Sequence, residues 1–419
     1  MNGGPFGSKL TSKRYTASGV PVIRGTNLSG PSKFSFEDFV FVSDETANEL
    51  LANNAHPGDL VFTQRGTIGQ VGLIPANSPF SRFVISQSQM KLTPDLEQVD
   101  PFYLYYYFSS PESVVEIRNL AMSSGVPHIN LEILRGFNVV TPPLACQRSI
   151  ANILSAYDDL IENCQRRIRI LEDMARGLYR EWFVHFRFPG ADALPRVDSP
   201  LGLIPRGWVV MQLGGVCARM ESGGTPRRNE ASFWEGGTIP WFKTKELWDG
   251  HLLESEEQVT DFGLAKSSAR LFEAGTILMA IYGAPTVGRL GILCGQGSCN
   301  QAALGMVAHD AVASQLFLYF SLFHLRDHFN GIAQGAAQQN ISKEKVAGTS
   351  VRVPPRSLIA KFDTAAIPMF DQIRTLRLQI TNLRRTRDLL LPRLLSGQID
   401  VGVAESMAGV EATEPAAAA

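Results

Sequence analysis

The two Pro-Pro pairs of this chain are the first place to look for methyl-transfer chemistry. A methyltransferase motif needs Asp or Asn before the pair and an aromatic residue after it, but Thr141–Leu144 and Val353–Arg356 have neither. The phosphate-binding pattern GxxxxGK(S/T) does not occur in the sequence. Both proline pairs precede helical patterns, where proline has a structural use. We therefore predict that the chain is not an enzyme.

The cysteines and two histidines are the remaining candidates for metal chemistry. Cys294 and Cys299 are too widely spaced for a zinc knuckle and lack a second pair, so buried free thiols are expected. His324 and His328 are four residues apart without a glutamate between them, which favours a polar helix edge over a metal site. Five cysteines are an odd count without the density of a disulfide scaffold, and this indicates a reducing, cytoplasmic setting.

Clusters of polar residues near predicted strand ends are the better candidates for a function. Arg, Asn and Gln can make the paired hydrogen bonds that distinguish bases in the major groove of DNA. The same residues are common turn formers, so each one taken alone is more simply a scaffold or phosphate contact. The candidates in the first half are Gln64, Arg65, Thr67, Gln87, Gln89, Ser124, His128 and Asn130. Those in the second half are Lys243, Thr244, Lys245, Tyr282, Thr286, Asn300, Gln301, Gln338, Gln339 and Asn340.

Composition limits the class of protein. Hydrophobic residues make up 44% and charged residues 19% of 419 residues, which is typical of a globular chain with two ordinary domains. No apolar run is long enough to span a membrane, and Met1–Leu10 does not resemble a secretory signal. The net charge of −1 is low for a protein that grips DNA alone, because neutralising phosphates supplies most of the non-specific affinity. Either DNA is not the ligand or a partner contributes positive charge.

The chain is an internal duplication with an offset of 212 residues. Gly125–Pro143 corresponds to Ala337–Pro355, and each segment is followed by a helical pattern of roughly forty residues, or on the order of 60 Å. Apolar residues recur in alternating steps of four and three along both helices, the heptad seam of a coiled coil. Two separate amphipathic helices are the alternative, but helices this long exceed one small domain. The predicted seam comprises Ile150, Leu154, Tyr157, Ile161, Ile168, Leu171, Leu178, Phe362, Ile373, Leu376, Ile380, Leu383, Leu390 and Leu394. Arg387 is the one charged residue at a seam position.

Strand-like segments with regular glycines precede each helix, and Phe102–Phe108 and Leu316–Phe323 are predicted buried helices. The fold class is therefore α+β: two strand-rich mixed α/β recognition domains, separated by two long helices in an antiparallel coiled coil, as a tandem repeat with pseudo-two-fold symmetry. The predicted segments are domain 1 at 1–143, spacer helix 1 at 144–187, a linker at 188–207, domain 2 at 208–355, spacer helix 2 at 356–400, and a disordered tail at 401–419.

A rigid rod that holds two different modules at a fixed distance suits a ligand with two separated features along a line, and DNA is the natural candidate. Because the modules differ in sequence outside their framework, the expected target is asymmetric. The second helix also carries a net charge of +5, which could face phosphates or form an ordinary solvated surface. Its charges are Arg356, Lys361, Arg374, Arg377, Arg384, Arg385, Arg387 and Arg393 against Asp363, Asp371 and Asp388.

Several motifs together resemble the specificity subunits of Type I restriction–modification systems. They are Gly4–Leu10 followed by Gly19–Leu28, Glu181–Gly190 with Leu201–Trp208, and Leu391–Ile399. The resemblance covers nearly the whole chain. It implies binding to double-stranded DNA, and assembly with two modification (methyltransferase) subunits and with restriction (translocase and endonuclease) subunits. It also implies that S-adenosylmethionine, ATP and Mg²⁺ belong to those partners, with no cofactor in this chain.

One departure from the family pattern concerns the first domain. The second domain begins with Trp208–Gly214 before Gly223-Gly224-Thr225-Pro226, whereas the first begins almost at the equivalent Gly3-Gly4-Pro5. About fifteen residues with a first strand are expected to lie upstream, or the first domain is impaired or supported in another way. Two other classes of function stay open: a coiled-coil scaffold with two non-DNA binding modules, and a standalone enzyme, which would need turnover by the isolated chain.

Overall fold

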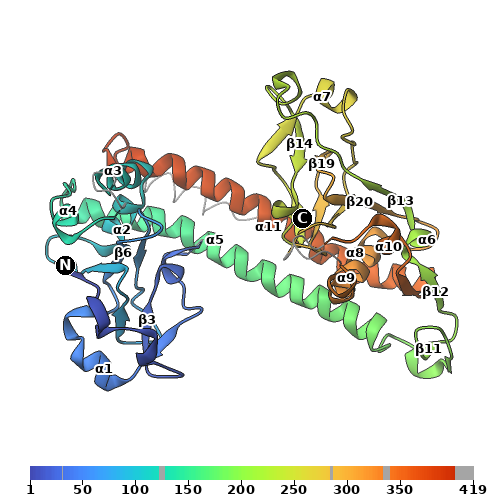
Figure 1. Cartoon of the computed structure of the whole chain (residues 1–419), viewed down its shortest axis with the longest axis horizontal. Coiled ribbons are helices and arrows are strands. Elements are labelled where there is room, and N and C mark those ends of the chain that lie inside the picture. Colours follow the sequence, from blue (N-terminus) through green and yellow to red (C-terminus); the bar gives the residue numbers. More distant parts are fainter. Residues whose placement is uncertain (31, 122–127, 284–285, 334–339, 402–419) are drawn as a thin grey trace, which may run out of the picture. The chain divides into compact units, whose positions relative to one another are not determined.

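The computed structural model describes residues 1–30, 32–121, 128–283, 286–333 and 340–401 (Figure 1). The chain divides into two compact units, one of 1–163 with 380–419 and the other of 164–379. Each unit therefore takes its sheets from one half of the sequence and part of each long helix. Among the described residues, no helix combines the length and apolar composition that crossing a membrane requires.

The first unit contains two sheets. The four-stranded sheet has the order β1-β9-β6-β7, formed by Asn2–Gly3, Gln89–Leu92, Leu60–Thr63 and Val71–Leu73. The five-stranded sheet has the order β2-β4-β3-β8-β5, formed by Tyr15–Thr16, Val40–Val42, Val20–Ile23, Phe83–Ile85 and Asn54–Ala55. Its helices are α1 (Asp44–Glu49), α2 (Pro101–Ser109), α3 (Pro111–Ala121) and α4 (Leu131–Arg135).

The second unit repeats this plan with additions. Its five-stranded sheet has the order β13-β20-β17-β18-β15, formed by Cys217–Ser222, Ala303–Ala308, Ile277–Ala280, Leu290–Leu293 and Gly250–Leu252. A three-stranded sheet β16-β14-β19 is formed by Glu257–Val259, Ile239–Phe242 and Ser298–Cys299. Short pairs are β10 (Arg196–Val197) with β11 (Ile204–Pro205), and β12 (Val209–Gln212) with β21 (Ser350–Val353). The helices are α6 (Leu213–Val216), α7 (Asp261–Ala265), α8 (Gln315–His324), α9 (Arg326–Ile332) and α10 (Lys343–Ala347).

Strand pairing shows that the two units are copies of one design. In the first unit, β3 is parallel to β8 and antiparallel to β4; in the second, β14 is parallel to β19 and antiparallel to β16. The parallel pairs place Ile23 beside Ile85 and Phe242 beside Cys299. Ile23 is therefore the counterpart of Phe242. The sequence alone suggests pairing Val22–Gly30 with Phe242–Gly250, because both segments follow an apolar-Pro pair and end in glycine, and that pairing is wrong by one residue.

The two aromatic segments form buried helices, as predicted. In α2, Tyr103, Leu104, Tyr106 and Phe108 are buried, and in α8 every residue from Leu316 to Leu322 is buried. Each helix is capped by an oxygen that satisfies otherwise unpaired backbone N–H groups of the first turn. Asp100 accepts hydrogen bonds from the amides of Phe102 and Tyr103, and Ser314 accepts one from the amide of Phe317.

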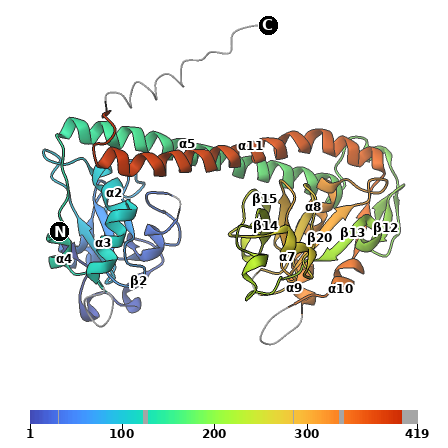
Figure 2. The ribbon, with the colours of Figure 1, turned by 90° about the horizontal axis from the view of Figure 1, so that it is seen from above.

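The long helices are α5 (Leu144–Tyr179) and α11 (Arg356–Leu395), and in each unit they lie side by side (Figures 1 and 2). Contacts join residue 172 to 377, 164 to 379, and 158 to 387, so one number falls as the other rises and the helices are antiparallel. All fourteen predicted seam residues are buried or half-buried. Both helices begin directly after a Pro-Pro pair.

The helix ends differ from the predicted segments. A π-helical turn at Arg180–Val184 follows α5, and α11 ends at Leu395 before the predicted boundary at 400. Residues 402–419 of the predicted tail lie outside the described part of the chain.

The two units also differ at one sheet edge. In the second unit β21 pairs with β12, whereas the equivalent residues 138–141 are in no strand of the described first unit. Two backbone carbonyls there accept hydrogen bonds from α2 instead: Val140 from the Tyr103 hydroxyl at 2.6 Å, and Asn138 from the Tyr107 hydroxyl at 3.2 Å.

Candidate nucleic-acid interface

The turns that carry the predicted reading residues are joined by the same backbone hydrogen bonds in both units. In the first unit, Gln64 N–H donates to Ser88 at 2.7 Å, and Ile129 N–H donates to the carbonyl of Gln64 at 3.1 Å. In the second unit, Ile281 N–H donates to Ala302 at 2.8 Å, and Ile341 N–H donates to the carbonyl of Ile281 at 2.9 Å. Three segments far apart in sequence therefore meet at one edge of each unit.

A fourth segment joins this edge through the strand β3 or β14. Ser86 N–H donates to Ile23 in the first unit and Asn300 N–H donates to Phe242 in the second, each at 3.0 Å. A short 3₁₀ turn follows each strand, at Gly25–Leu28 and at Thr244–Glu246. We name these four segments in each unit the reading edge. In the first unit they contain Ile23, Gln64, Ser88 and Ile129, and in the second they contain Phe242, Ile281, Ala302 and Ile341.

Arg24 is a candidate that the sequence analysis missed. It occupies the position of Lys243, because each residue directly follows the paired strand. The Arg24 amide donates to Asn27 Oδ1 at 2.9 Å and the Lys243 amide donates to Glu246 Oε2 at 2.8 Å, so both turns have the same local geometry. An alignment that pairs Ile23 with Phe242 places Arg24 opposite Lys243, and it would have identified Arg24 as a candidate.

A glycine and an arginine shape one loop of each reading edge. Gly69 and Gly288 have φ of 92° and 81°, a left-handed conformation that favours glycine. The side chain of Arg118 lies against Gly69, and its Nε donates to the carbonyl of Ile68 at 3.3 Å. Arg326 lies against Gly288 in the same way, and its Nε donates to the carbonyl of Gly288 at 2.9 Å. Neither arginine was singled out in the sequence, because each belongs to a helix far along the chain.

The candidates of the first unit fall into different environments. Arg65, Thr67 and Gln87 are exposed, whereas Gln64, His128 and Asn130 are half-buried. The side chain of Gln89 is only 1% exposed and accepts a hydrogen bond from Ser86, so in this conformation it lies inside the unit. Ser124 lies outside the described residues.

Two further first-unit candidates are engaged within the protein. The Gln87 amide donates to the carbonyls of Gly7 at 2.6 Å and Leu10 at 2.9 Å. Asn130 caps α4 by accepting the Ile133 amide at 2.8 Å. In this conformation the side chains of Gln87 and Asn130 hydrogen-bond to backbone groups of the protein. Arg65 is an exposed cation of the same reading edge.

The candidates of the second unit show the same division. Lys245, Tyr282, Gln301 and Asn340 are exposed, and Lys243, Thr244, Thr286 and Asn300 are half-buried. The Thr286 hydroxyl donates to the Gly283 carbonyl at 2.7 Å, and Gln301 accepts from Thr225. Gln338 and Gln339 lie outside the described residues.

Glutamates neutralise the lysines of the second reading edge. Lys243 contacts Glu257 and Glu256, and Lys245 lies 2.6 Å from Glu256. The hydrogen bond to Glu257 raises the pKa of Lys243. A phosphate would have to compete with these carboxylates for the two lysines. This local neutralisation agrees with the net charge of −1 of the whole chain.

The charges of α11 divide between internal pairs and solvent. Arg377 pairs with Glu172 at 3.0 Å, Arg387 with Asp158 at 2.6 Å, and Arg356 with Asp363 at 3.6 Å. The remaining cations are exposed: Lys361, Arg374, Arg384, Arg385 and Arg393. Ion pairing thus accounts for three of the eight, and of these three Arg356 is itself exposed.

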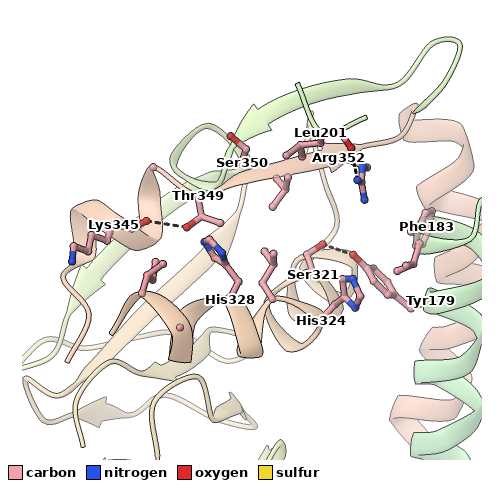
Figure 3. Close-up of a pocket in the computed structure, with 16 residues that line it drawn as sticks. Tyr179, Phe183, Leu201, Ser321, His324, His328, Lys345, Thr349, Ser350 and Arg352 are labelled. Carbon is pink, nitrogen blue, oxygen red and sulfur yellow. Dashed lines mark hydrogen bonds between the residues drawn. The ribbon is translucent and has the colours of Figure 1, made fainter. Parts of the chain in front are cut away.

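His324 and His328 line a cavity of about 950 Å³ in the second unit (Figure 3). They belong to two different helices and not to one helix edge. His324 ends α8 and His328 belongs to α9. Burial lowers the pKa of His324, and the nearby charge of Arg352 adds to this effect. Within the described ranges, no group of three His, Cys, Asp or Glu residues is placed to hold a metal ion.

The other polar groups of the cavity and the cysteines are in structural settings. Tyr179 Oη and Ser321 Oγ lie 3.0 Å apart in the interior, and burial raises the pKa of Tyr179 to about 12 (Figure 3). All five cysteines are free thiols, and burial raises the pKa of Cys299 to about 12. Both groups therefore stay protonated at neutral pH.

Comparison with known proteins gives one consistent assignment. The Type I restriction modification DNA specificity domain matches residues 7–172 and again 205–367. The Type I restriction enzyme MjaIX specificity subunit of Methanocaldococcus jannaschii is 26% identical over 397 residues, covering 93% of this chain and 89% of that protein. The HindI specificity subunit of Haemophilus influenzae is 22% identical, with coverage of 82% and 86%.

A solved structure has the same fold. The Type-I restriction-modification system S subunit from M. genitalium superposes with a TM-score of 0.59 at 16% identity, covering 94% of this chain and 92% of that one. The chain therefore belongs to the Type I restriction modification DNA specificity family, whose members are non-catalytic specificity subunits.

Proposed function

We propose that this chain selects the DNA target of a Type I restriction–modification complex by reading a bipartite, asymmetric sequence with its two units. One observation carries the proposal: the reading edge has the same backbone framework in both units but different side chains. Arg65 corresponds to Tyr282, and Ser88 corresponds to Ala302, because each pair occupies the same place in the shared hydrogen-bond pattern. A shared framework with different side chains suits two half-sites of different sequence.

The long helices support a fixed distance between the half-sites. They contain 36 and 40 residues, which corresponds to about 54 and 60 Å of α-helix. An antiparallel pair with a continuous apolar seam is stiffer than a loop of the same length, and each helix contributes to both units. We infer that this pair acts as the spacer of the target.

In this proposal, partner subunits supply the methyltransferase and restriction activities. Two apolar residues on α11 within the second unit, Ile367 and Leu378, are exposed and lie eleven residues apart. Eleven residues turn an α-helix to within about 20° of three full turns, so the two share one face. We propose that this face helps to dock two modification subunits, which together with restriction subunits clamp the DNA in the cytoplasm. In this proposal S-adenosylmethionine, ATP and Mg²⁺ bind to those partners.

A map of methylated adenines tests the proposal. Cells would express the neighbouring modification subunit with or without this chain, and adenine methylation would be sequenced across the genome. A split, asymmetric motif that disappears without this chain is the expected result. Methylation that does not depend on the chain would contradict it.

The second candidate is a coiled-coil scaffold with two modules for a ligand other than DNA. It is favoured by the net charge of −1 and by the glutamates that pair with Lys243 and Lys245. Binding of the assembled complex to random duplex DNA separates the two candidates. Salt-dependent binding supports the DNA reader, because released counterions make affinity fall with salt.

A further inference from the structure

We propose that the ion pair between Asp249 and Arg326 is a positioning device that locks two loops of the second reading edge to each other. Asp249 follows the 3₁₀ turn that begins after Lys243, and Arg326 is the first residue of α9. Arg326 Nη1 donates to Asp249 Oδ2 at 2.9 Å, and its Nη2 donates to Asp249 Oδ1. A two-bonded arginine–carboxylate pair fixes orientation as well as distance.

The same arginine holds the loop between β17 and β18. Its Nε donates to the carbonyl of Gly288 at 2.9 Å, and its Cγ would lie 3.0 Å from a Cβ built at that glycine. Thr286 and Tyr282, both predicted reading residues, belong to this loop. The Arg326 guanidinium therefore binds Asp249 through its two Nη atoms and the carbonyl of Gly288 through its Nε.

Asp249 binds that second loop directly as well. Its Oδ1 accepts the Leu290 amide at 2.9 Å, and its own amide donates to the carbonyl of Leu290 at 2.8 Å. Nearby, the Arg289 guanidinium lies over the exposed ring of Trp248 at 4.5 Å. The loop of Lys243–Asp249 and the segment 288–290 are thus tied at several points around Asp249.

Backbone conformation supports a specific need for this carboxylate. Asp249 has φ of 60°, a conformation that glycine adopts far more easily. An aspartate retained at a position suited to glycine indicates that its side chain does something that glycine cannot.

The pair is also anchored to the spacer helices within the second unit. Gly250, the next residue, lies against the guanidinium of Arg377, which pairs with Glu172 of α5 at 3.0 Å. A Cβ at Gly250 would lie 2.5 Å from Arg377 Nη2, so a larger residue there would displace this guanidinium. The reading loops are therefore held both to each other and to the helices that set their place.

The functional part of this inference rests on the proposed function, and Asp249→Gly is the variant that tests it. Glycine removes the carboxylate without adding backbone strain at this left-handed position, and urea unfolding of the variant measures any accompanying loss of stability. Arg326→Lys is the complementary variant, because it keeps the charge but loses the two-bonded geometry. Glu221→Gln is the matched control, since it removes an ion pair with Arg219 on β13 of the same unit.

Two measurements are made on the full chain assembled with its modification subunits. The first is the affinity for the target duplex relative to duplexes with one changed base pair, taken separately for each half-site. We expect Asp249→Gly and Arg326→Lys to reduce discrimination about tenfold at one half-site and to leave the other unchanged, a loss comparable to one good base contact. The second is amide hydrogen exchange, which should accelerate at 244–249 and 286–290 but not at 64–70.

Each outcome decides the question. Unchanged discrimination with unchanged exchange would overturn the positioning role, and equal losses at both half-sites would reveal a global defect instead. Faster exchange with unchanged discrimination would keep the lock but overturn its role in specificity. If the wild-type complex recognises no split motif, the proposed function itself fails, and the exchange measurement still decides whether the ion pair joins the loops.

Discussion

Asp158 joins four parts of the first unit through one carboxylate. It accepts a hydrogen bond from the Tyr106 hydroxyl of α2 at 2.6 Å, and it pairs with Lys33 at 3.0 Å and with Arg387 of α11 at 2.6 Å. Burial alone would raise the pKa of Asp158, but the hydrogen bond from Tyr106 and the charges of Lys33 and Arg387 outweigh it. The pKa therefore lies below its ordinary value of 3.8.

We expect Asp158→Asn to lower the free energy of unfolding by about 3 kcal/mol at pH 7, because it removes the carboxylate that Lys33 and Arg387 share and leaves Arg387 with the exposed Asp388 as its ion-pair partner. A folded-state pKa below the unfolded value means that the stabilisation is complete above about pH 4 and is lost as the pH falls through the folded pKa. Urea unfolding between pH 3 and pH 7 measures both effects. Asp159→Asn, at the exposed neighbouring position, is the control and should change little.

Arg65 is the exposed cation of the first reading edge, and its guanidinium can make a paired contact with guanine. We expect Arg65→Ala to relax one base position of one half-site and to cost about 1–3 kcal/mol of discrimination there. Competition binding with single-base variants of the target measures this loss. Arg82→Ala is the control, since Arg82 pairs with Asp44 of α1 rather than lying on the reading edge. A uniform loss over all sequences would instead identify Arg65 as a phosphate contact.

At the scale of single residues, the sequence indicates candidates by residue type alone. The polar clusters were singled out because Arg, Asn and Gln are recognisable by type, but type does not determine exposure. Gln89 lies in a strand whose neighbours cover it, and Arg118 and Arg326 reach the loops from helices some 40–50 residues away in sequence. Such long-range contacts depend on tertiary packing, which no local pattern records.

At the scale of the helix, the seam of α5 can be tested with two identical substitutions. Leu154 is fully buried against Tyr103, Tyr106 and Leu391, whereas Leu160 on the same helix is 53% exposed. We expect Leu154→Ala to lower the free energy of unfolding by about 2–5 kcal/mol and Leu160→Ala to change it by less than about 0.5 kcal/mol. Chemical denaturation of both variants gives the comparison, and equal effects would contradict the seam.

The seam was predictable because a heptad is a local repeat that can be counted in the sequence. Its exception, Arg387, is explained only by the structure, which supplies Asp158 as its partner. The strand order was not predictable, because parallel pairs such as β3 with β8 join segments about sixty residues apart. The one-residue shift between the halves has the same origin, since only strand pairing fixes which residues correspond.

For the molecule as a whole, independent units predict independent half-sites. We expect replacement of 192–355 by the corresponding segment of another family member to change one half of the methylation motif and to preserve the other. Methylome sequencing of cells that express the hybrid with its modification subunit measures the result. The reciprocal exchange of 1–143 is the matched control, and it should change the opposite half. A change in both halves from either exchange would contradict independent reading.

The length of the helix pair should set the distance between the half-sites. Insertion of seven residues after Asn163 in α5 and after Gln379 in α11 would place each insertion where the chain passes from one compact unit to the other. Seven residues add about 10.5 Å of helix and keep the heptad seam in register, so the expected target has a spacer longer by about three base pairs.

Two control insertions separate length from damage to the coil. Seven residues in α5 alone leave the helices unequal, and five residues in both helices rotate the following seam by about 140°, away from its partner. We expect both controls to lose specific methylation, whereas the paired heptad insertion retains it at a longer target. Sequencing the methylated adenines measures spacer length directly. Retention of the original spacer by the paired insertion would show that the helices do not set the distance, because the added length would then have no effect on where the second half-site is read.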